Sequence, residues 1–360
     1  MNSNVLITGG AGFIGSNFIR YLQKSEPETI IVNLDLLTYA GSLENLKDLK
    51  NQNNYHFIEG DICDQQLVEA LLREHKIDTI VHFAAESHVD RSLEGPGAFI
   101  QTNIVGTHKL LEAARHVWLN EKLITDRPVR FHHISTDEVY GTLTPSDPPF
   151  EETTPYAPNS PYAASKASSD HLVRAYFHSF GLPITISNCS NNYGPYQFPE
   201  KLIPLMILNA LTGKSLPMYG DGLQIRDWLY VEDHCDAIWK IIQHGSIGES
   251  YNIGGGNQPT NLEIVETICA LLDEKERLSE YKPHQQLIEF VKDRPGHDRR
   301  YAMNITKIHN ELGWRPTHDL EEGLKKTVDW YLDNTEWLNK ILKEKDYQKW
   351  VQINYQKRGN

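Results

Sequence analysis

Two short segments of the sequence carry side chains suited to proton transfer. Tyr162 and Lys166 stand four residues apart, so on a helix they share one face. Ser160 is suited to cap that helix and Pro161 to occupy its first position, which places Tyr162 in the first turn. There the helix dipole and the Lys166 ammonium both favour the phenolate, so we expect Tyr162 to act as a base.

The second segment, residues 135–141, follows a predicted strand. It places a hydroxyl at Thr136 next to two adjacent carboxyls, Asp137 and Glu138. One neutral and one ionised carboxyl make an acid and a base, and the Thr136 hydroxyl can join the proton network of Tyr162. Two acids at such a place can also be solvated loop residues or a helix cap. The nucleotide site described next favours the catalytic interpretation, with five catalytic residues: Thr136, Asp137, Glu138, Tyr162 and Lys166.

A glycine-rich turn near the N-terminus predicts that nucleotide site. An apolar run at 5–8 leads into Gly9, Gly12 and Gly15, a spacing that lets the backbone approach a pyrophosphate at a helix N-terminus. Asp35 ends the next apolar run, 20 residues after Gly15. A carboxylate there accepts hydrogen bonds from ribose hydroxyls and repels a 2′-phosphate, so we predict NAD rather than NADP.

Residues that follow the later strands fit the same cofactor, because ligands of such sheets bind beyond the carboxyl ends of the strands. The Asp61 carboxylate can meet an adenine amine, and the small Ala84 and Ala85 leave room for a dinucleotide. The predicted cofactor-binding residues are Gly9, Gly12, Phe13, Ile14, Gly15, Asp35, Leu36, Leu37, Thr38, Asp61, Ile62, Phe83, Ala84, Ala85, Ser87, Thr102, Tyr162, Lys166 and Asn192.

These side chains need a scaffold, and the first 190 residues alternate short apolar runs with amphipathic stretches. Strands are expected at 5–8, 30–34, 56–58, 79–84, 130–135 and 184–188, and helices near 13–24, 64–75, 98–119 and 161–180. Near-continuous apolar strands separated by helices indicate an α/β fold with a doubly wound parallel sheet of the Rossmann type. Residues 142–161 contain six prolines and are expected to form a long irregular loop.

Beyond residue 190 the alternation is less regular. A helix at 231–243 and a strand at 249–253 can return to the main sheet, whereas the neighbouring segments are rich in Pro, Gly, Asn and Arg. We therefore predict an NAD-binding domain of residues 1–190 plus 229–257, and a smaller substrate domain of residues 191–228 plus 258–360. The tail from 334 is amphipathic, and Trp337 and Trp350 are its expected docking residues.

Composition limits the class of protein. The chain has 360 residues and a net charge of −13, which disfavours nonspecific binding of nucleic acid or membranes. Four scattered cysteines without a Cys-x-x-Cys pair suit a reducing compartment. His132 and His133 are adjacent on a strand and point to opposite faces, so we expect no metal site. The N-terminus lacks a signal pattern and no apolar run is long enough to cross a membrane, so a cytoplasmic protein is expected.

Together these motifs resemble the extended short-chain dehydrogenase/reductases and, more closely, the dTDP-glucose 4,6-dehydratases. The glycine turn, the Tyr162-x-x-x-Lys166 pair and the strand order carry the wider resemblance. The closer one rests on segments 35–41, 84–92, 135–141, 191–202 and 293–298, and it extends from residue 4 to about 330. Leu36 departs from the family pattern, which usually has Lys there.

The resemblance implies a reaction on dTDP-glucose that gives dTDP-4-keto-6-deoxyglucose and water, in deoxysugar biosynthesis with rhamnose as the expected product. Tyr162 takes the C4 hydroxyl proton while hydride passes to NAD, Glu138 takes the C5 proton, and Asp137 protonates the departing C6 hydroxyl. Hydride then returns to C6. The implied substrate-binding residues are Ser87, His88, Thr136, Asp137, Glu138, Asn191, Glu200, Lys201, Leu202, Pro217, Tyr219, Arg226, Asn261, Arg294 and His297.

Other enzymes of this fold remain alternatives: a 4-epimerase, a decarboxylase or a GDP-mannose dehydratase. An epimerase needs the Tyr and Lys but no carboxyl pair after the Thr, and the base preference rests on the resemblance alone. A noncatalytic NAD-sensing protein would be expected to lose Tyr162, Lys166 or the carboxyls. Members of the family are usually homodimers that pair the helices near 98–119 and 161–180. Four apolar residues there face either a partner or their own sheet: Val105, Leu110, Leu172 and Tyr176.

Overall fold

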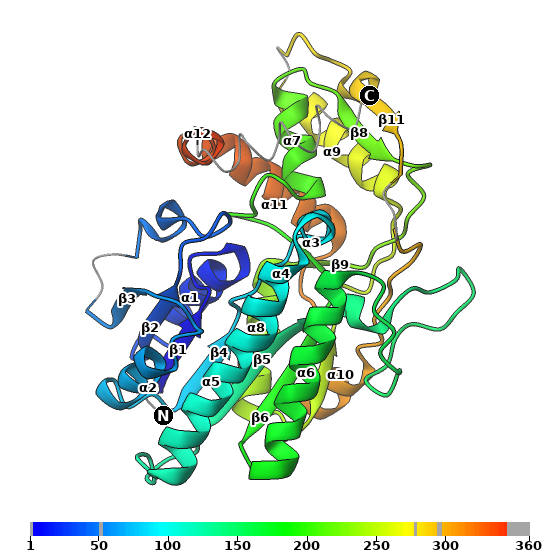
Figure 1. The fold of residues 1–360 in the computed structure, drawn as a ribbon. Coiled ribbons are helices and arrows are strands. Elements are labelled where there is room, and N and C mark those ends of the chain that lie inside the picture. The colour runs from blue at the N-terminus through cyan, green and yellow to red at the C-terminus, as the bar shows by residue number, and fades with distance from the viewer. Residues whose placement is uncertain (1–2, 50–52, 277–278, 294–296, 344–360) are drawn as a thin grey trace.

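Seven parallel strands form the main sheet of the computed structural model, which describes residues 3–49, 53–276, 279–293 and 297–343 (Figure 1). The spatial order is β10-β6-β5-β4-β1-β2-β3, and every neighbouring pair is parallel. The strands are β1 Asn4–Thr8, β2 Ile30–Asp35, β3 Tyr55–Glu59, β4 Thr79–His82, β5 Arg130–Thr136, β6 Ile184–Cys189 and β10 Ser250–Ile253. The predicted doubly wound Rossmann sheet is therefore confirmed.

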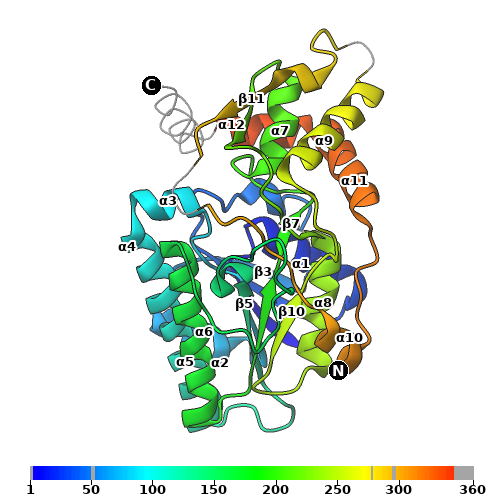
Figure 2. The same ribbon diagram turned by 90° about the vertical axis from the view of Figure 1, so that its right-hand side faces the viewer.

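Helices cover both faces of this sheet, which explains why its strands are apolar on both sides. Figure 2 shows α5 and α6 on one side of the strands and α1 and α8 on the other. The first layer is completed by α2. Their bounds are α1 Phe13–Ser25, α2 Gln65–Glu74, α5 Thr107–Ala114, α6 Pro161–Phe180 and α8 Val231–His244.

Helix α6 begins and ends as its sequence predicts. The Ser160 hydroxyl accepts a hydrogen bond from the Ala163 amide at 3.0 Å, and Pro161 occupies the first turn. Gly181 closes the helix in a left-handed conformation, with φ of 70°. This fixed start places Tyr162 and Lys166 at the carboxyl end of β5.

Two predicted elements differ from the structure in detail. The helix expected at 98–119 is built of α4 Pro96–Phe99, a π-helical stretch Ile100–Gly106, α5, and a second π-helical stretch Arg115–Asn120. It is preceded by α3 Val89–Glu94. The strand expected at 79–84 ends at His82, because the Ala84 amide turns to the Thr8 hydroxyl at 3.3 Å instead of a strand partner. Phe83 and Ala84 thereby become loop residues at the edge of the sheet.

A second lobe lies above the sheet in Figure 1. It consists of α7 Leu202–Leu211, α9 Asn261–Lys275, α11 Leu320–Asp333 and α12 Thr335–Lys343, with a parallel pair of short strands, β8 Leu216–Tyr219 and β11 Ile288–Val291. These elements share one hydrophobic core. Trp337 is buried in it and donates through its indole nitrogen to Asn45 at 2.8 Å, which confirms its docking role, whereas Trp350 lies outside the described residues.

Two short connections join the lobes. Strand β7 Asn191–Tyr193 pairs in parallel with β9 Trp228–Tyr230. Helix α10 Thr306–Leu312 packs on the sheet side, where Ile308 and Trp314 share a core with β10. The predicted loop 142–161 is irregular, and its Phe150 is held by backbone hydrogen bonds with Ala302 and Asn304, each 2.8 Å. The division of the chain into two domains at the predicted boundaries stays a prediction.

Candidate active site

A pocket of about 300 Å³ runs along the carboxyl ends of the main strands and reaches the start of the second lobe. This is the edge at which parallel α/β sheets bind ligands. Most of the predicted site residues line it: Gly9, Gly12, Phe13, Ile14, Gly15, Asp35, Leu36, Thr38, Asp61, Ile62, Phe83, Ala84, Ala85, Ser87, Thr102, Thr136, Asp137, Glu138, Tyr162, Lys166, Asn191, Asn192, Glu200 and Lys201.

The first turn of the pocket has no room for side chains. Gly9 has a φ of +74°, and a Cβ there would lie 2.6 Å from the Ala84 amide nitrogen. A Cβ on Gly15 would lie 2.4 Å from the Gly9 carbonyl oxygen. Gly12 caps α1 without any side-chain hydrogen bond, so the first amides of that helix are open to a ligand. This cradle fits the pyrophosphate of a dinucleotide.

Asp35 stands at the pocket wall as a fixed carboxylate. One of its oxygens accepts from the Ala11 amide and the other from the Leu37 amide, each at 2.8 Å. Burial raises the pKa of Asp35, and the two backbone hydrogen bonds oppose that rise. Each carboxylate oxygen can accept a second hydrogen bond. The donor set therefore fits the ribose hydroxyls of NAD.

The five predicted catalytic residues meet at the other end of the pocket. Strand β5 ends at Thr136, and a single 3₁₀ turn, Asp137–Tyr140, follows it. The Thr136 hydroxyl oxygen accepts from the Glu138 amide at 3.3 Å and caps this turn. The same side chain is close enough to Tyr162 to lower the pKa of its phenol, against the effect of burial. The short turn thus brings two carboxyls and a hydroxyl to the first turn of α6.

Asp137 is buried in a way that favours its neutral form. Its side chain is only 2% exposed, and burial raises its pKa well above the usual range. The nearby carboxyls of Glu138 and Asp227 raise it further, against the opposing charge of Arg226. One oxygen accepts from the Thr136 hydroxyl at 3.2 Å, and the other has no hydrogen-bond partner among the described residues. A protonated carboxyl at this place can donate a proton into the pocket.

The environment of Tyr162 differs from the prediction. Burial raises the pKa of its phenol well above the usual value, and the charge of Glu138 adds to the rise. The Lys166 ammonium donates to the Ile134 carbonyl at 2.7 Å. Burial therefore opposes the phenolate that was expected from the helix start and Lys166, and the role of Tyr162 as a base stays a prediction.

Several predicted residues lie away from this pocket. Leu37 packs against the core beneath β2, and Leu202 opens α7 and packs into the second lobe. His88 caps α3. The others sit in the second lobe or at its border: Pro217, Tyr219, Arg226, Asn261 and His297. Arg294 lies outside the described residues.

Among these, Arg226 interacts electrostatically with the catalytic end. Its guanidinium lies over the Tyr301 ring at 4.4 Å and donates to the Asp298 carbonyl at 2.9 Å. Its charge acts on the pKa of Asp137, as noted above. Arg226 thereby links the second lobe electrostatically to the carboxyl pair.

Comparison with known proteins agrees with this geometry. The family model described as GDP-mannose 4,6-dehydratase matches residues 6–327. The dTDP-glucose 4,6-dehydratase of Salmonella typhimurium is 55% identical over 98% of this chain and 99% of its own length. The enzyme of Xanthomonas campestris is 56% identical over 94% and 95%. The chain belongs to the dTDP-glucose 4,6-dehydratase family.

Solved structures of dTDP-glucose 4,6-dehydratases share the whole architecture. The Bacillus anthracis enzyme, in complex with NAD, is 47% identical with a TM-score of 0.83 and covers 94% of this chain and 99% of its own. The Streptomyces venezuelae enzyme, with NAD and dTDP bound, is 43% identical with a TM-score of 0.86 over the same shares. A UDP-glucose 4-epimerase of Thermotoga maritima has the same fold at 29% identity and a TM-score of 0.80, covering 92% of this chain and 99% of its own. The fold alone therefore does not separate dTDP-glucose 4,6-dehydratases from epimerases.

Several residues that line the pocket were not predicted as site residues from the sequence. They are Leu34, Ala40, Gly41, Gly60, Glu86, Ile134, Ser135, Cys189, Ser190, Gln197 and Phe198. Gly60 and Cys189 stand at the ends of β3 and β6, so the strand-end rule could have found them. Phe198 and Glu86 lie within segments that carried the family resemblance. No sequence pattern indicated Ser190 as a site residue.

The four cysteines are all free, and no group of three or more His, Cys, Asp or Glu side chains within the described ranges could hold a metal ion. His132 contacts Thr185 and Ser187 of β6, whereas His133 contacts Ser169 of α6. No helix in the described part of the chain is long and apolar enough to cross a membrane.

Proposed function

We propose that this chain converts dTDP-glucose to dTDP-4-keto-6-deoxyglucose and water, with NAD as a bound cofactor. The observation that carries the proposal is the buried carboxyl of Asp137 next to Glu138, in the same pocket as Tyr162. A 4-epimerase of this fold needs the Tyr162 and Lys166 pair but has no use for a second acid and base. The activity of dTDP-glucose 4,6-dehydratases more than 50% identical to this chain supports the same substrate.

The residues of the chain divide the proton transfers among them. Tyr162, assisted by Thr136 and the Lys166 ammonium, takes the proton of the C4 hydroxyl as a phenolate. A ketone at C4 then acidifies the C5 hydrogen, which Glu138 removes as a base. Asp137, held neutral by burial, protonates the C6 hydroxyl as it leaves as water. Oxidation comes first because an unactivated C5–H is too weak an acid for a carboxylate.

NAD bound along the strand ends would supply the redox chemistry, taking hydride from C4 and returning it to C6, while a proton returns to C5. The glycines at positions 9, 12 and 15 would hold its pyrophosphate and Asp35 its adenosine ribose. Asp61 and Lys166 line the same pocket and are the proposed contacts for the adenine and the nicotinamide ribose. Thr38, Thr102 and Asn192 complete the proposed cofactor contacts.

We propose that the substrate lies between the sheet and the second lobe, across the predicted domain boundary. Lys201 already joins the two, since its ammonium donates to the Ser87 carbonyl at 3.0 Å. Asn261 opens α9 with an amide oxygen that has no described hydrogen-bond partner, which suits a nucleotide. Arg226 is the proposed diphosphate partner because its planar fork matches phosphate oxygens.

The proposal includes a homodimer that forms in the cytoplasm. Of the apolar residues considered, Leu110 is fully buried against its own sheet and Tyr176 donates to Glu112 at 2.5 Å, so neither is available to a partner. Ile100 and Phe180 are about half exposed at the ends of the paired helices and support the interface better. The product would enter deoxysugar synthesis, with dTDP-rhamnose as the proposed destination.

Mass spectrometry of the sugar nucleotide after incubation tests the activity. Loss of one water from dTDP-glucose, with UDP-glucose and GDP-mannose unchanged in parallel, is the expected result. An isomer or carbon dioxide from another nucleotide sugar would move the function to an epimerase or a decarboxylase. Retention of NAD by the purified protein with no turnover of any sugar nucleotide would favour a noncatalytic role.

A further inference from the structure

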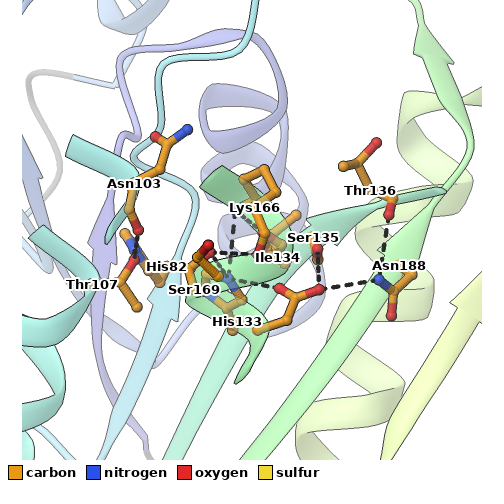
Figure 3. Close-up of polar contacts among 12 residues, drawn as sticks. His82, Asn103, Thr107, His133, Ile134, Ser135, Thr136, Lys166, Ser169 and Asn188 are labelled. Atoms are coloured by element: carbon orange, nitrogen blue, oxygen red, sulfur yellow. Dashed lines mark hydrogen bonds and ion pairs between the residues drawn. The ribbon is translucent and has the colours of Figure 1, made fainter. Parts of the chain in front are cut away.

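A buried carboxylate lies one helical turn beyond Lys166. Asp170 is fully buried in α6, and one of its oxygens accepts from the Ser135 hydroxyl at 2.7 Å and the Tyr156 hydroxyl at 2.9 Å. The Asn188 amide approaches the same oxygen at 3.4 Å. Figure 3 shows Ser135, Asn188, His133 and Lys166 in the same region, near the carboxyl end of β5. A carboxyl this deep in the protein is costly unless such donors and a positive charge stabilise it.

His133 stands between Asp170 and Lys166. The second oxygen of Asp170 lies 3.2 Å from His133 Nε2, and the Lys166 ammonium lies 3.5 Å from the same nitrogen. The Ser169 hydroxyl, which donates to the Lys166 carbonyl at 2.8 Å, lies 3.3 Å from it. The His133 ring thus connects the Asp170 carboxyl to the Lys166 ammonium. Burial and the Lys166 charge keep the pKa of His133 well below its usual value, so the ring is neutral.

The other groups that face the Lys166 ammonium are uncharged as well. His82, on β4, is held by the hydroxyls of Thr8 at 2.8 Å and Thr107 at 3.0 Å, and burial lowers its pKa well below the usual value. Burial raises the pKa of the Cys189 thiol to about 12. Burial likewise raises the pKa of Tyr162, on the same helix. Burial lowers the pKa of Lys166, and the Asp170 carboxyl is the group that most opposes this change. Burial raises the pKa of Asp170 itself, and the Lys166 charge and the hydrogen bonds from Ser135, Tyr156 and Asn188 oppose that rise.

We propose that Asp170 is a positioning residue for the reaction, whose carboxylate keeps the buried Lys166 ammonium charged and in place beside Tyr162. Lys166 is 4% exposed and donates to the Ile134 carbonyl, which carries no net charge. Asp170 shares its helix face four residues on and supplies the missing charge. Through its hydrogen bond with Ser135, Asp170 also connects α6 to the end of β5. Asp137 and Glu138 follow directly after that strand. This inference rests on the proposed function, in which Lys166 assists Tyr162.

Asp170→Asn tests the role of the charge, because it keeps the shape of the side chain. We expect kcat to fall on the order of tenfold with KM for dTDP-glucose within about twofold, since the substrate does not touch Asp170. The alkaline limb of the kcat profile should move to lower pH, because a lysine without its counter-charge loses its proton more readily. Asp170→Glu, which restores the charge, should move the limb back.

A second readout does not depend on turnover. Lys166 lines the pocket, so its modification by acetic anhydride, followed by peptide mass spectrometry, reports how much of the amine is unprotonated. In Asp170→Asn the midpoint of this reaction should lie at lower pH than in the unchanged protein. Asp78→Asn is the matched control: Asp78 is equally buried but lies before β4 at the opposite end of the sheet, bound to Arg127 at 2.6 Å. It should cost stability and leave both pH profiles in place.

Tyr156→Phe covers the case in which Asp170→Asn does not fold. It removes one donor from the Asp170 carboxylate and should shift both profiles in the same direction by less. Unshifted profiles in folded Asp170→Asn or Tyr156→Phe, or equal shifts in Asp78→Asn, would overturn the positioning role. If the unchanged protein does not dehydrate dTDP-glucose, the proposed function fails instead, while the acetic anhydride result still decides whether Asp170 holds the Lys166 charge.

Discussion

The edge of the main sheet and the second lobe both contribute to the proposed site, but they are built differently. At the sheet edge, short turns after parallel strands deliver the side chains, so Asp35, Thr136 and Asp137 reach one pocket although they are far apart in sequence. In the second lobe, Arg226 lies in an irregular segment and Asn261 at the start of α9, and backbone hydrogen bonds hold these two parts of the chain together. The sheet topology therefore positions the proposed catalytic and cofactor-binding residues, whereas packing in the second lobe positions the proposed substrate-binding residues.

The largest expected effect is at the sheet edge, in Asp137→Asn. The amide cannot donate an acidic proton to the C6 hydroxyl, so kcat should fall on the order of 100-fold or more while oxidation at C4 is slowed much less. Rapid-quench measurement of the separate steps checks this. Equal slowing of oxidation and elimination would contradict the role of acid.

The pH dependence sharpens the same assignment. Burial and two neighbouring carboxyls raise the pKa of Asp137, so its proton stays on above the usual range of an aspartic acid and is lost as pH rises through the raised value. Elimination should therefore fall on the alkaline side, and Asp137→Asn should lack that fall. A single-turnover pH profile of elimination in both proteins would detect it, and an identical profile would argue against Asp137 as the titrating group.

Glu138→Gln separates the two adjacent carboxyls. An amide cannot accept the C5 proton, so exchange of the C5 hydrogen with solvent deuterium should drop on the order of 100-fold while NAD stays bound. Exchange read by NMR of the recovered sugar nucleotide measures this. Undiminished exchange would remove Glu138 as the base and leave Asp137 with both roles.

A smaller effect is expected at the other end of the same edge, in Asp35→Ala. The change removes the acceptors for the Ala11 and Leu37 amides and for a ribose, so NAD should bind about tenfold or more weakly. Calorimetric titration of NAD measures it. Asp35→Asn keeps an acceptor oxygen and should lose less affinity; unchanged NAD affinity in the alanine variant would misplace the ribose contact.

Arg226→Lys tests whether the second lobe binds the substrate and not NAD. Lysine keeps the charge but not the fork that donates to the Asp298 carbonyl and lies over Tyr301, so KM for dTDP-glucose should rise about fivefold. NAD affinity should not change, since Arg226 does not line the pocket of the strand ends. If NAD affinity falls as much as substrate affinity, the two regions do not divide the ligands as proposed.

The same contrast explains what the sequence could predict. Strand ends follow from apolar runs and glycine turns, so Asp35 and Thr136 were placed in the pocket by the rule that ligands bind at strand ends. Tyr162 was placed by the helix-start signals of Ser160 and Pro161. The effect of burial on the pKa of Tyr162 was not predicted, because this burial arises from segments distant in the chain, and residue spacing carries no information on solvation. The π-helical turns within 100–120 were not predicted either. Over so short a stretch, the spacing of apolar residues does not distinguish the hydrogen-bond pattern of a π-helix from that of an α-helix.

Leu36→Lys has the smallest expected effect. It tests whether the residue directly after the strand-end carboxylate Asp35 contributes to NAD binding. Leu36 follows Asp35, lines the pocket, and is 49% exposed, so it departs from the family pattern at a position where a side chain can reach solvent. Because an exposed substitution usually changes free energies by less than about 0.5 kcal/mol, NAD affinity and kcat should stay within about twofold. Leu36→Asp is the matched change of opposite charge, and it should weaken NAD binding more, since it adds a negative charge beside the phosphates. If the lysine variant instead binds NAD tenfold more tightly, Leu36 marks an adaptation of the cofactor site and the strand-end rule must include the residue after the carboxylate.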